Sequence, residues 1–184
     1  MSEIASTRQL RAALLRWVIV LVPGLVLLGF LSGAASGSVA ANPWFAALAK
    51  PGLYPPPATF GIVWSLLYMM MGLALAIIIT AWGAKGRGLA IGLFAGQFVV
   101  NLAWSPLFFG AHRILGALIL LGVLDVLVLA TVWAFARVRP LAAGLLVPYL
   151  AWVLFATLLN WQFWQINPEA DGQPAPSAAV QVAI

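Results

Sequence analysis

Three stretches of the sequence each carry a tryptophan with a hydrogen-bonding side chain three or four residues away. The pairs are Trp64 with Tyr68, Asn101 with Trp104, and Tyr149 with Trp152. Residues at this spacing share one face of a helix, and Gln97 extends the face of Asn101 by one turn. Aromatic rings with a few polar groups are typical of a small-molecule site. The same side chains could instead form a helical core in which the amides bond across helices.

The sequence offers few residues for catalysis or metal binding. The sequence has no Cys, one histidine and four scattered acidic residues, so it offers no thiolate, no disulfide and no metal cluster. It has no Ser-His-Asp set, no paired acids and no phosphate-binding glycine loop. His112 lies in a Gly-Ala-His-Arg turn, where a solvated side chain is favoured over a haem ligand. We expect no catalytic or metal-binding residues, and a non-enzyme is favoured.

The composition predicts a membrane protein. Hydrophobic residues make up 64% of the 184 and charged residues only 7%, whereas soluble domains have about 25% charged residues. Lipid requires every backbone polar group to be bonded internally. The apolar runs continue for about 20 residues, the length of a spanning helix, and do not alternate as barrel strands do. We therefore predict an all-α membrane protein, a bundle of five transmembrane helices in one domain.

The runs between charges and turn residues give the limits of these helices. The predicted spans are 16–37, 58–82, 87–109, 114–137 and 140–165, within a membrane domain of residues 16–166. A Pro-rich loop, 42–57, joins the first two spans, residues 1–15 form an N-terminal extension, and 167–184 form a flexible tail.

Basic residues predict the orientation. Seven of them fall on the N-terminal side and only Lys50 and Arg113 on the other, which places the N-terminus in the cytoplasm and the C-terminus outside a bacterial cell membrane. Six of the nine tryptophans lie near helix ends, as in interfacial belts. They are Trp17, Trp82 and Trp133 on the inner side, and Trp44, Trp161 and Trp164 on the outer side. An alternative interpretation is a cleavable signal that ends near residues 38–40.

Small and acidic residues inside the spans suggest two further features. Gly88, Gly92 and Gly96 form one stripe, on which two helices could approach closely in lipid, so we predict a homodimer interface there. A second stripe follows Gly29 on the first span, and either stripe could pack within the monomer. Asp125 lies in the middle of the fourth span. It is either protonated and bonded to a neighbouring helix or faces a polar cavity, and a proton-relay role is one alternative.

Three motifs resemble a known family. They are KPGLYPPPATFGIVWSLLY at 50–68, NLAWSPLFFG at 101–110, and VPYLAW with ATLLN at 147–160. They are similar to motifs of the tryptophan-rich sensory protein family, which includes the peripheral benzodiazepine receptor. The resemblance runs in order from about residue 42 to 167.

The resemblance implies a dimeric five-helix bundle that binds porphyrins, and sterols or benzodiazepine-type drugs in animal members. It places the pocket walls at Trp64, Tyr68, Asn101, Trp104, Trp152 and Ala156, and a loop lid at Pro55 and Pro56. To the ligand-binding residues the helix spacing adds Tyr149, and the lid loop also carries Tyr54 and Lys50, a cation that could meet a propionate. Two departures matter. Leu53 and Ala58 stand where the family often has tryptophan, and Leu159, Trp161 and Gln165 break the animal sterol pattern.

The sequence therefore predicts a membrane receptor or sensor for tetrapyrroles, protoporphyrin or haem, with no obligatory cofactor and no nucleic-acid partner. It could also move or chaperone them. A transporter of tetrapyrroles or sterols is one alternative, although inverted repeats and broken helices are not visible. A photo-oxidative enzyme that degrades bound porphyrin is another.

Overall fold

The computed structural model describes residues 6–37 and 42–174, and all regular structure in these ranges is helical. The elements are α1 (Thr7–Ala35), α2 (Pro43–Ala47), α3 (Pro57–Ile79), α4 (Arg87–Ser105), the π-helical η1 (Pro106–Gly110), α5 (Ile114–Val138), α6 (Pro140–Ile166) and the 3-10 turn η2 (Pro168–Ala170). Within the described residues, five helices are long and apolar enough to cross a membrane. They are α1, α3, α4 with η1, α5 and α6, which confirms the predicted five-helix membrane fold.

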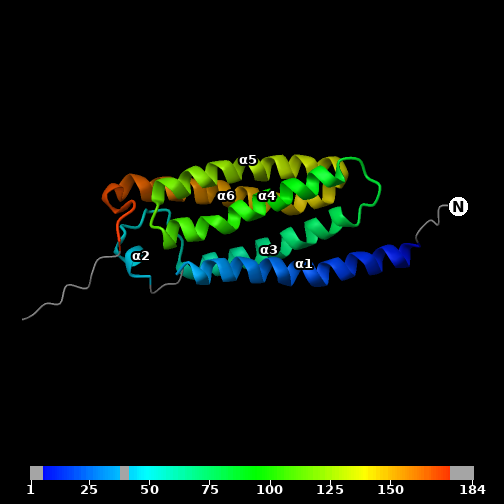
Figure 1. Ribbon diagram of the computed structural model, residues 1–184, viewed down its shortest axis with the longest axis horizontal. Coiled ribbons are helices and arrows are strands. Elements are labelled where there is room, and N and C mark those ends of the chain that lie inside the picture. Colours follow the sequence, from blue (N-terminus) through cyan, green and yellow to red (C-terminus); the bar gives the residue numbers. More distant parts are fainter. Residues whose placement is uncertain (1–5, 38–41, 175–184) are drawn as a thin grey trace, which may run out of the picture.

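The five long helices run side by side along the length of the molecule (Figure 1). The helix α1 packs on α3, α3 on α6, α6 on α5 and α5 on α4, and α4 also touches α1 and α3. At Gly72 of α3, an added Cβ would lie 2.8 Å from the Cα atom of Val22 in α1. The missing side chain thus lets these two backbones approach closely, as small residues do between membrane helices.

The first helix begins earlier than predicted, at Thr7. The Ser6 hydroxyl accepts from the Gln9 backbone N–H at 3.3 Å, and the Gln9 side chain accepts from the Ser6 backbone N–H at 2.7 Å. This reciprocal pair is a capping box, which satisfies two otherwise free donors. Part of the predicted extension, residues 7–15, is therefore helical. The alternative cleavage site at 38–40 lies outside the described residues.

Pro106 explains why the third span ends in a π turn. Proline has no N–H, so it cannot bond the carbonyl four residues earlier, and that carbonyl belongs to Leu102. The Ser32 hydroxyl of α1 donates to the Leu102 carbonyl at 2.6 Å instead. The break in α4 thereby becomes a link between α4 and α1.

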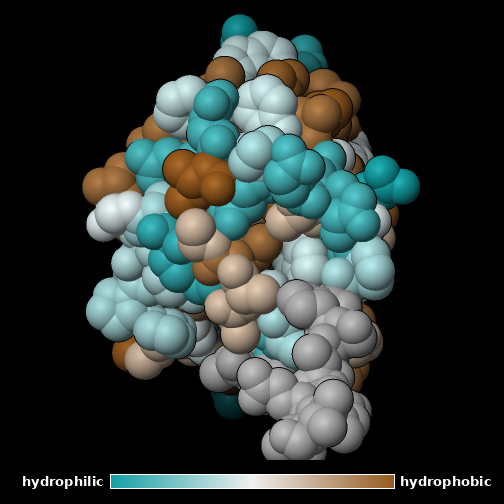
Figure 2. Space-filling model, turned by 90° about the vertical axis from the view of Figure 1, so that its left-hand side faces the viewer, coloured by the Kyte–Doolittle hydropathy of each residue, from teal (hydrophilic) through white to brown (hydrophobic). Residues whose placement is uncertain are grey.

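The side of the bundle is apolar and its ends are polar. Val99, Val126 and Leu141, on three different helices, expose about two thirds of their surface or more, as lipid-facing residues do. The end that carries α2 and η2 shows mostly hydrophilic residues with scattered hydrophobic ones (Figure 2).

Short helices and hydrogen bonds fix this end. Asn42 caps α2 by accepting from the Phe45 N–H at 2.9 Å. Residues 167–174, assigned by the sequence to the tail, bond to the rest of the chain through four residues: Asn167 to Ala49, Asp171 to Ile114, and Gly172 and Gln173 to His112. Residues 175–184 lie outside the described residues.

Candidate ligand site

Four rings from three helices form an inner aromatic cluster, made of Trp64, Tyr68, Phe98 and Tyr149. Trp64 stacks on Tyr68 with ring centroids 5.2 Å apart and meets Tyr149 edge-on at 6.3 Å. Phe98 of α4 lies edge-on to Tyr68 at 6.1 Å. The cluster joins α3, α4 and α6, so it brings together three of the predicted ligand-binding residues.

Two amides of α4 bond the hydroxyls of this cluster. The Tyr68 hydroxyl donates to Asn101 Oδ1 at 2.9 Å, and the Tyr149 hydroxyl donates to Gln97 Oε1 at 2.8 Å. Gln97 is fully buried, and its Nε2 has no hydrogen-bond partner among the described residues. A buried donor without a partner costs about 1–3 kcal/mol. The amide of Gln97 is therefore the group of the inner aromatic cluster that a ligand acceptor would stabilise most.

Trp104 lies in a second cluster nearer the α2 end. This outer aromatic cluster contains Trp44, Phe45, Tyr54, Trp104, Phe108, Phe109 and Phe163. Trp104 stacks on Phe108 at 5.1 Å, and its Nε1 donates to Asn160 Oδ1 at 3.2 Å. Trp104 thus has a different hydrogen-bond partner from its helix neighbour Asn101, which bonds Tyr68, but it also packs against the core that contains Tyr68 and Tyr149. Asn160 was not among the predicted site residues. A single amide inside an apolar run would have indicated a buried polar contact there.

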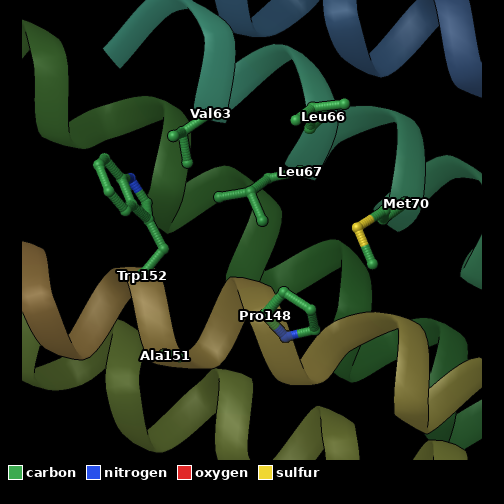
Figure 3. Close-up of a pocket in the computed structure, with 7 residues that line it drawn as sticks. All are labelled: Val63, Leu66, Leu67, Met70, Pro148, Ala151 and Trp152. Atoms are coloured by element: carbon green, nitrogen blue, oxygen red, sulfur yellow. The ribbon is translucent and has the colours of Figure 1, made fainter. Parts of the chain in front are cut away.

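Trp152 has a third environment, a groove between α3 and α6 (Figure 3). The groove has a volume of about 430 Å³ and is lined by Val63, Leu66, Leu67, Met70, Pro148, Ala151 and Trp152. The ring centroid of Trp152 lies 5.9 Å from that of Phe60 and 5.3 Å from that of Phe155. Of the predicted ligand-binding residues, Trp152 alone lines this groove. Ala156 follows one turn later and is half-buried against the core. Phe60, four residues before Trp64, was missed although it shares a helix face with it.

The predicted lid residues pack on the outer aromatic cluster. The Lys50 ammonium donates to the Leu48 carbonyl at 2.8 Å and to the Phe45 carbonyl, and it lies 4.2 Å from the centre of the Phe45 ring. Partial burial lowers the pKa of Lys50. Tyr54 lies between Phe45, Phe60 and Phe163, and burial raises its pKa.

The loop then passes directly into a helix. Pro55 is half-buried and Pro56 exposed, and Pro56 immediately precedes α3, whose first residue is Pro57. Proline at the first helical position is favoured because its missing N–H would have no partner there.

Trp44 and His112 form a pair that the sequence did not suggest. Trp44 is only 2% exposed, unlike a tryptophan of an interfacial belt, and His112 stacks on it at 4.5 Å. The Nδ1 atom of His112 lies 2.9 Å from the Gln173 carbonyl oxygen. The histidine backbone has a φ of 56°, a left-handed conformation rare outside glycine. His112 therefore closes the α2 end of the bundle.

Asp125 bonds a neighbouring helix, which was one of its two predicted arrangements. Thr157 Oγ1 lies 2.8 Å from Asp125 Oδ2 and 3.0 Å from the Val153 carbonyl oxygen. A hydroxyl has one proton and a carbonyl only accepts. The Thr157 hydroxyl therefore donates to the Asp125 carboxyl and shares its proton with the Val153 carbonyl of its own helix. The Oδ1 of Asp125 is buried without a partner among the described residues.

The two glycine stripes have different surroundings. An added Cβ on Gly29 of α1 would collide with the ring of Tyr68, whereas one on Gly88, Gly92 or Gly96 of α4 would meet nothing within 4 Å. The first stripe therefore packs inside the monomer at Gly29, and the α4 stripe faces outward.

The sequence also matches a known protein family. Residues 18–165 match the model of the TspO/MBR family. The chain belongs to the TspO/MBR family.

Individual relatives of this family agree over most of the chain. A translocator protein of Sus scrofa is 41% identical over 136 residues, which cover 73% of this chain and 80% of that protein. A tryptophan-rich protein TspO of Chlorobaculum tepidum is 40% identical over 146 residues, 79% of this chain and 92% of that protein. A tryptophan-rich sensory protein of Cereibacter sphaeroides is 38% identical over 130 residues, 69% and 80% of the two chains.

Proposed function

We propose that this TspO/MBR-family membrane protein is a receptor or sensor for tetrapyrroles, and that the inner aromatic cluster with the groove beside it forms the binding site. The observation that carries the proposal is the buried, unpaired Nε2 of Gln97, which belongs to the same cluster as Trp64, Tyr68 and Tyr149. Flat aromatic walls suit a planar macrocycle, and one unpaired donor suits an acceptor on it.

The groove supplies a route from the bilayer. It opens between α3 and α6 at Trp152 (Figure 3), and its volume lies within the range of about 300–1,000 Å³ for small-molecule sites. Leu67 lines the groove, and the next residue of α3, Tyr68, belongs to the inner aromatic cluster. Slight separation of α3 and α6 would therefore open the groove toward the inner aromatic cluster, so a ligand dissolved in lipid would bind without crossing water.

A fluorescence titration tests the binding. Protoporphyrin should quench the tryptophan fluorescence of the purified protein saturably, and haem and a sterol serve as comparison ligands. Trp152→Phe should weaken protoporphyrin binding by roughly 1 kcal/mol, because the indole provides aromatic contact. Unchanged affinity in both Trp64→Phe and Trp152→Phe would refute this site. The same sample under illumination tests the enzymatic alternative, in which a new chromophore would form.

The pair Gln97→Met and Tyr149→Phe separates ligand binding from folding. The double variant removes the donor, the acceptor and the hydroxyl together, so no polar group is left unpaired and the melting temperature should stay equal or rise. Porphyrin affinity should nevertheless fall about fivefold, the equivalent of one neutral hydrogen bond of about 1 kcal/mol. Full affinity in a stable double variant would show that Gln97 is merely part of the core.

A further inference from the structure

A notch lies between α4 and α5 at the end of the bundle opposite α2. It has a volume of about 310 Å³ and is lined by Lys85, Gly86, Leu89, Trp133, Ala134 and Arg137. Leu89, Trp133 and Ala134 make an apolar floor, and the cations Lys85 and Arg137 stand at the rim. The notch therefore has one polar and one apolar side at the level where a membrane helix meets water.

The cations at this end have no acidic partner among the described residues. Arg87 and Arg139 add two more positive charges beside Lys85 and Arg137. Glu169 and Asp171 lie at the opposite end, past α6. Asp125 is on α5, but it is twelve residues before Arg137, which is about 18 Å at 1.5 Å per residue. No acidic residue in the described part of the chain therefore neutralises the positive charge at this end.

Aromatic contacts hold two of the arginines at the membrane interface. The Arg137 guanidinium lies 5.0 Å from the centre of the Trp133 ring, and that of Arg87 lies 4.6 Å from Trp82. Both indoles are more than half exposed, as interfacial tryptophans are. The Arg87 Nε donates to the Ile79 carbonyl at 3.0 Å. Lys85 and Arg137, by contrast, bond no described side chain or backbone, so their donors remain open toward the notch.

We infer that this notch binds the headgroup of an anionic phospholipid. Its phosphate would lie between Lys85 and Arg137, and the adjoining acyl chain would follow Leu89 and Trp133 into the bilayer. Phosphate oxygens match the donors of both cations, and basic pockets between membrane helices are suited to acidic headgroups. The apolar floor selects a lipid over a free anion, because a free phosphate would gain nothing from it.

Native mass spectrometry and thermal unfolding of the full-length protein test this inference. Protein in phosphatidylcholine nanodiscs is compared with protein in discs that also contain phosphatidylglycerol. We expect phosphatidylglycerol to be retained preferentially and to raise the melting temperature. Each rim cation removed should weaken this preference about fivefold. The test variants are Lys85→Gln and Lys85→Gln with Arg137→Gln, and the matched control is Arg8→Gln with Arg11→Gln, two exposed cations at the start of α1.

The outcomes are distinct. Loss of the lipid preference in the rim variants, with retention in the control pair, supports the site. Equal loss in both pairs, or equal retention of the two lipids by the unmodified protein, overturns it. A stabilisation by inorganic phosphate equal to that by phosphatidylglycerol would overturn the lipid assignment in favour of a free-anion site. If the double variant does not fold, Lys85→Gln alone gives the same test, since Lys85 lies on an exposed loop.

Discussion

At the scale of single residues, polar groups inside the bundle are bonded to particular neighbours. Tyr68, Tyr149 and Trp104 each donate to an amide on another helix. Such bonds matter in lipid because water is absent as an alternative partner. Four buried side-chain atoms have no hydrogen-bond partner among the described residues: Trp44 Nε1, Gln97 Nε2, Asp125 Oδ1 and Gln162 Oε1. Of these, only Gln97 Nε2 belongs to a residue that bonds the inner aromatic cluster.

The contacts of Asp125 lead to a prediction about its charge. We propose that Asp125 is neutral in the bundle, and a neutral acid that accepts from Thr157 should be replaced with little loss by Asn, whose amide oxygen also accepts. Thr157→Val leaves the carboxyl without a partner and should cost about 1–3 kcal/mol of unfolding free energy. Denaturant unfolding in micelles measures both variants. If Asp125→Asn is as damaging as Thr157→Val, the aspartate is ionised in the folded protein and the protonated assignment fails.

At the scale of helices, proline and glycine decide which faces meet. Pro106 frees the Leu102 carbonyl for Ser32, and Gly29 gives the Tyr68 ring its space beside α1. The α4 stripe meets no neighbour, since an added Cβ at Gly92 would have open space around it. We propose that a second copy of the chain covers this stripe, because close backbone approach drives association in lipid.

Substitution of Gly92 tests the dimer. Gly92→Leu should shift the protein from dimer to monomer in detergent, measured by light scattering, and leave porphyrin affinity and melting temperature nearly unchanged, because the monomer has room for the side chain. Gly122→Leu on α5 is the matched control, since it too is exposed with open space, and it should stay dimeric. A Gly92→Leu protein that remains dimeric would place the interface elsewhere.

At the scale of the whole molecule, charge separates the two ends of the bundle. The α3–α4 connection and the start of α1 lie at one end and α2 at the other (Figure 1). Seven of the nine basic residues belong to the first end, and we propose from the positive-inside rule that this end faces the cytoplasm.

Cysteine labelling in intact cells tests this orientation. The protein has no native Cys, so the background is clean. Lys50→Cys should react with an impermeant reagent added outside, and Lys85→Cys should react only after the cells are opened. The α3 helix separates the two positions, so one must be accessible from each side. The reverse pattern would invert the topology.

The sequence by itself determined the five spans, because lipid leaves a long apolar run one way to satisfy its backbone, as a helix. The predicted limits differ from the observed ones by a few residues, except at α1, where the Ser6–Gln9 capping box was overlooked. Spacing also placed Trp64 and Tyr68 correctly on one face. Local pattern was sufficient for these features because each depends on residues close in the chain.

Only the tertiary structure decided how the aromatic residues are divided. Trp64, Trp104 and Trp152 all pack against the core that contains Tyr68 and Tyr149, but Trp104 also joins the outer aromatic cluster and Trp152 also lines the groove. This division depends on α3 packing against α6 rather than mainly against its sequence neighbour α4. Likewise, the Gly29 and Gly92 stripes look alike in sequence, but Tyr68 lies against the first and open space against the second. Contacts between distant segments depend on side-chain shapes from several helices at once, and spacing within one helix does not contain them.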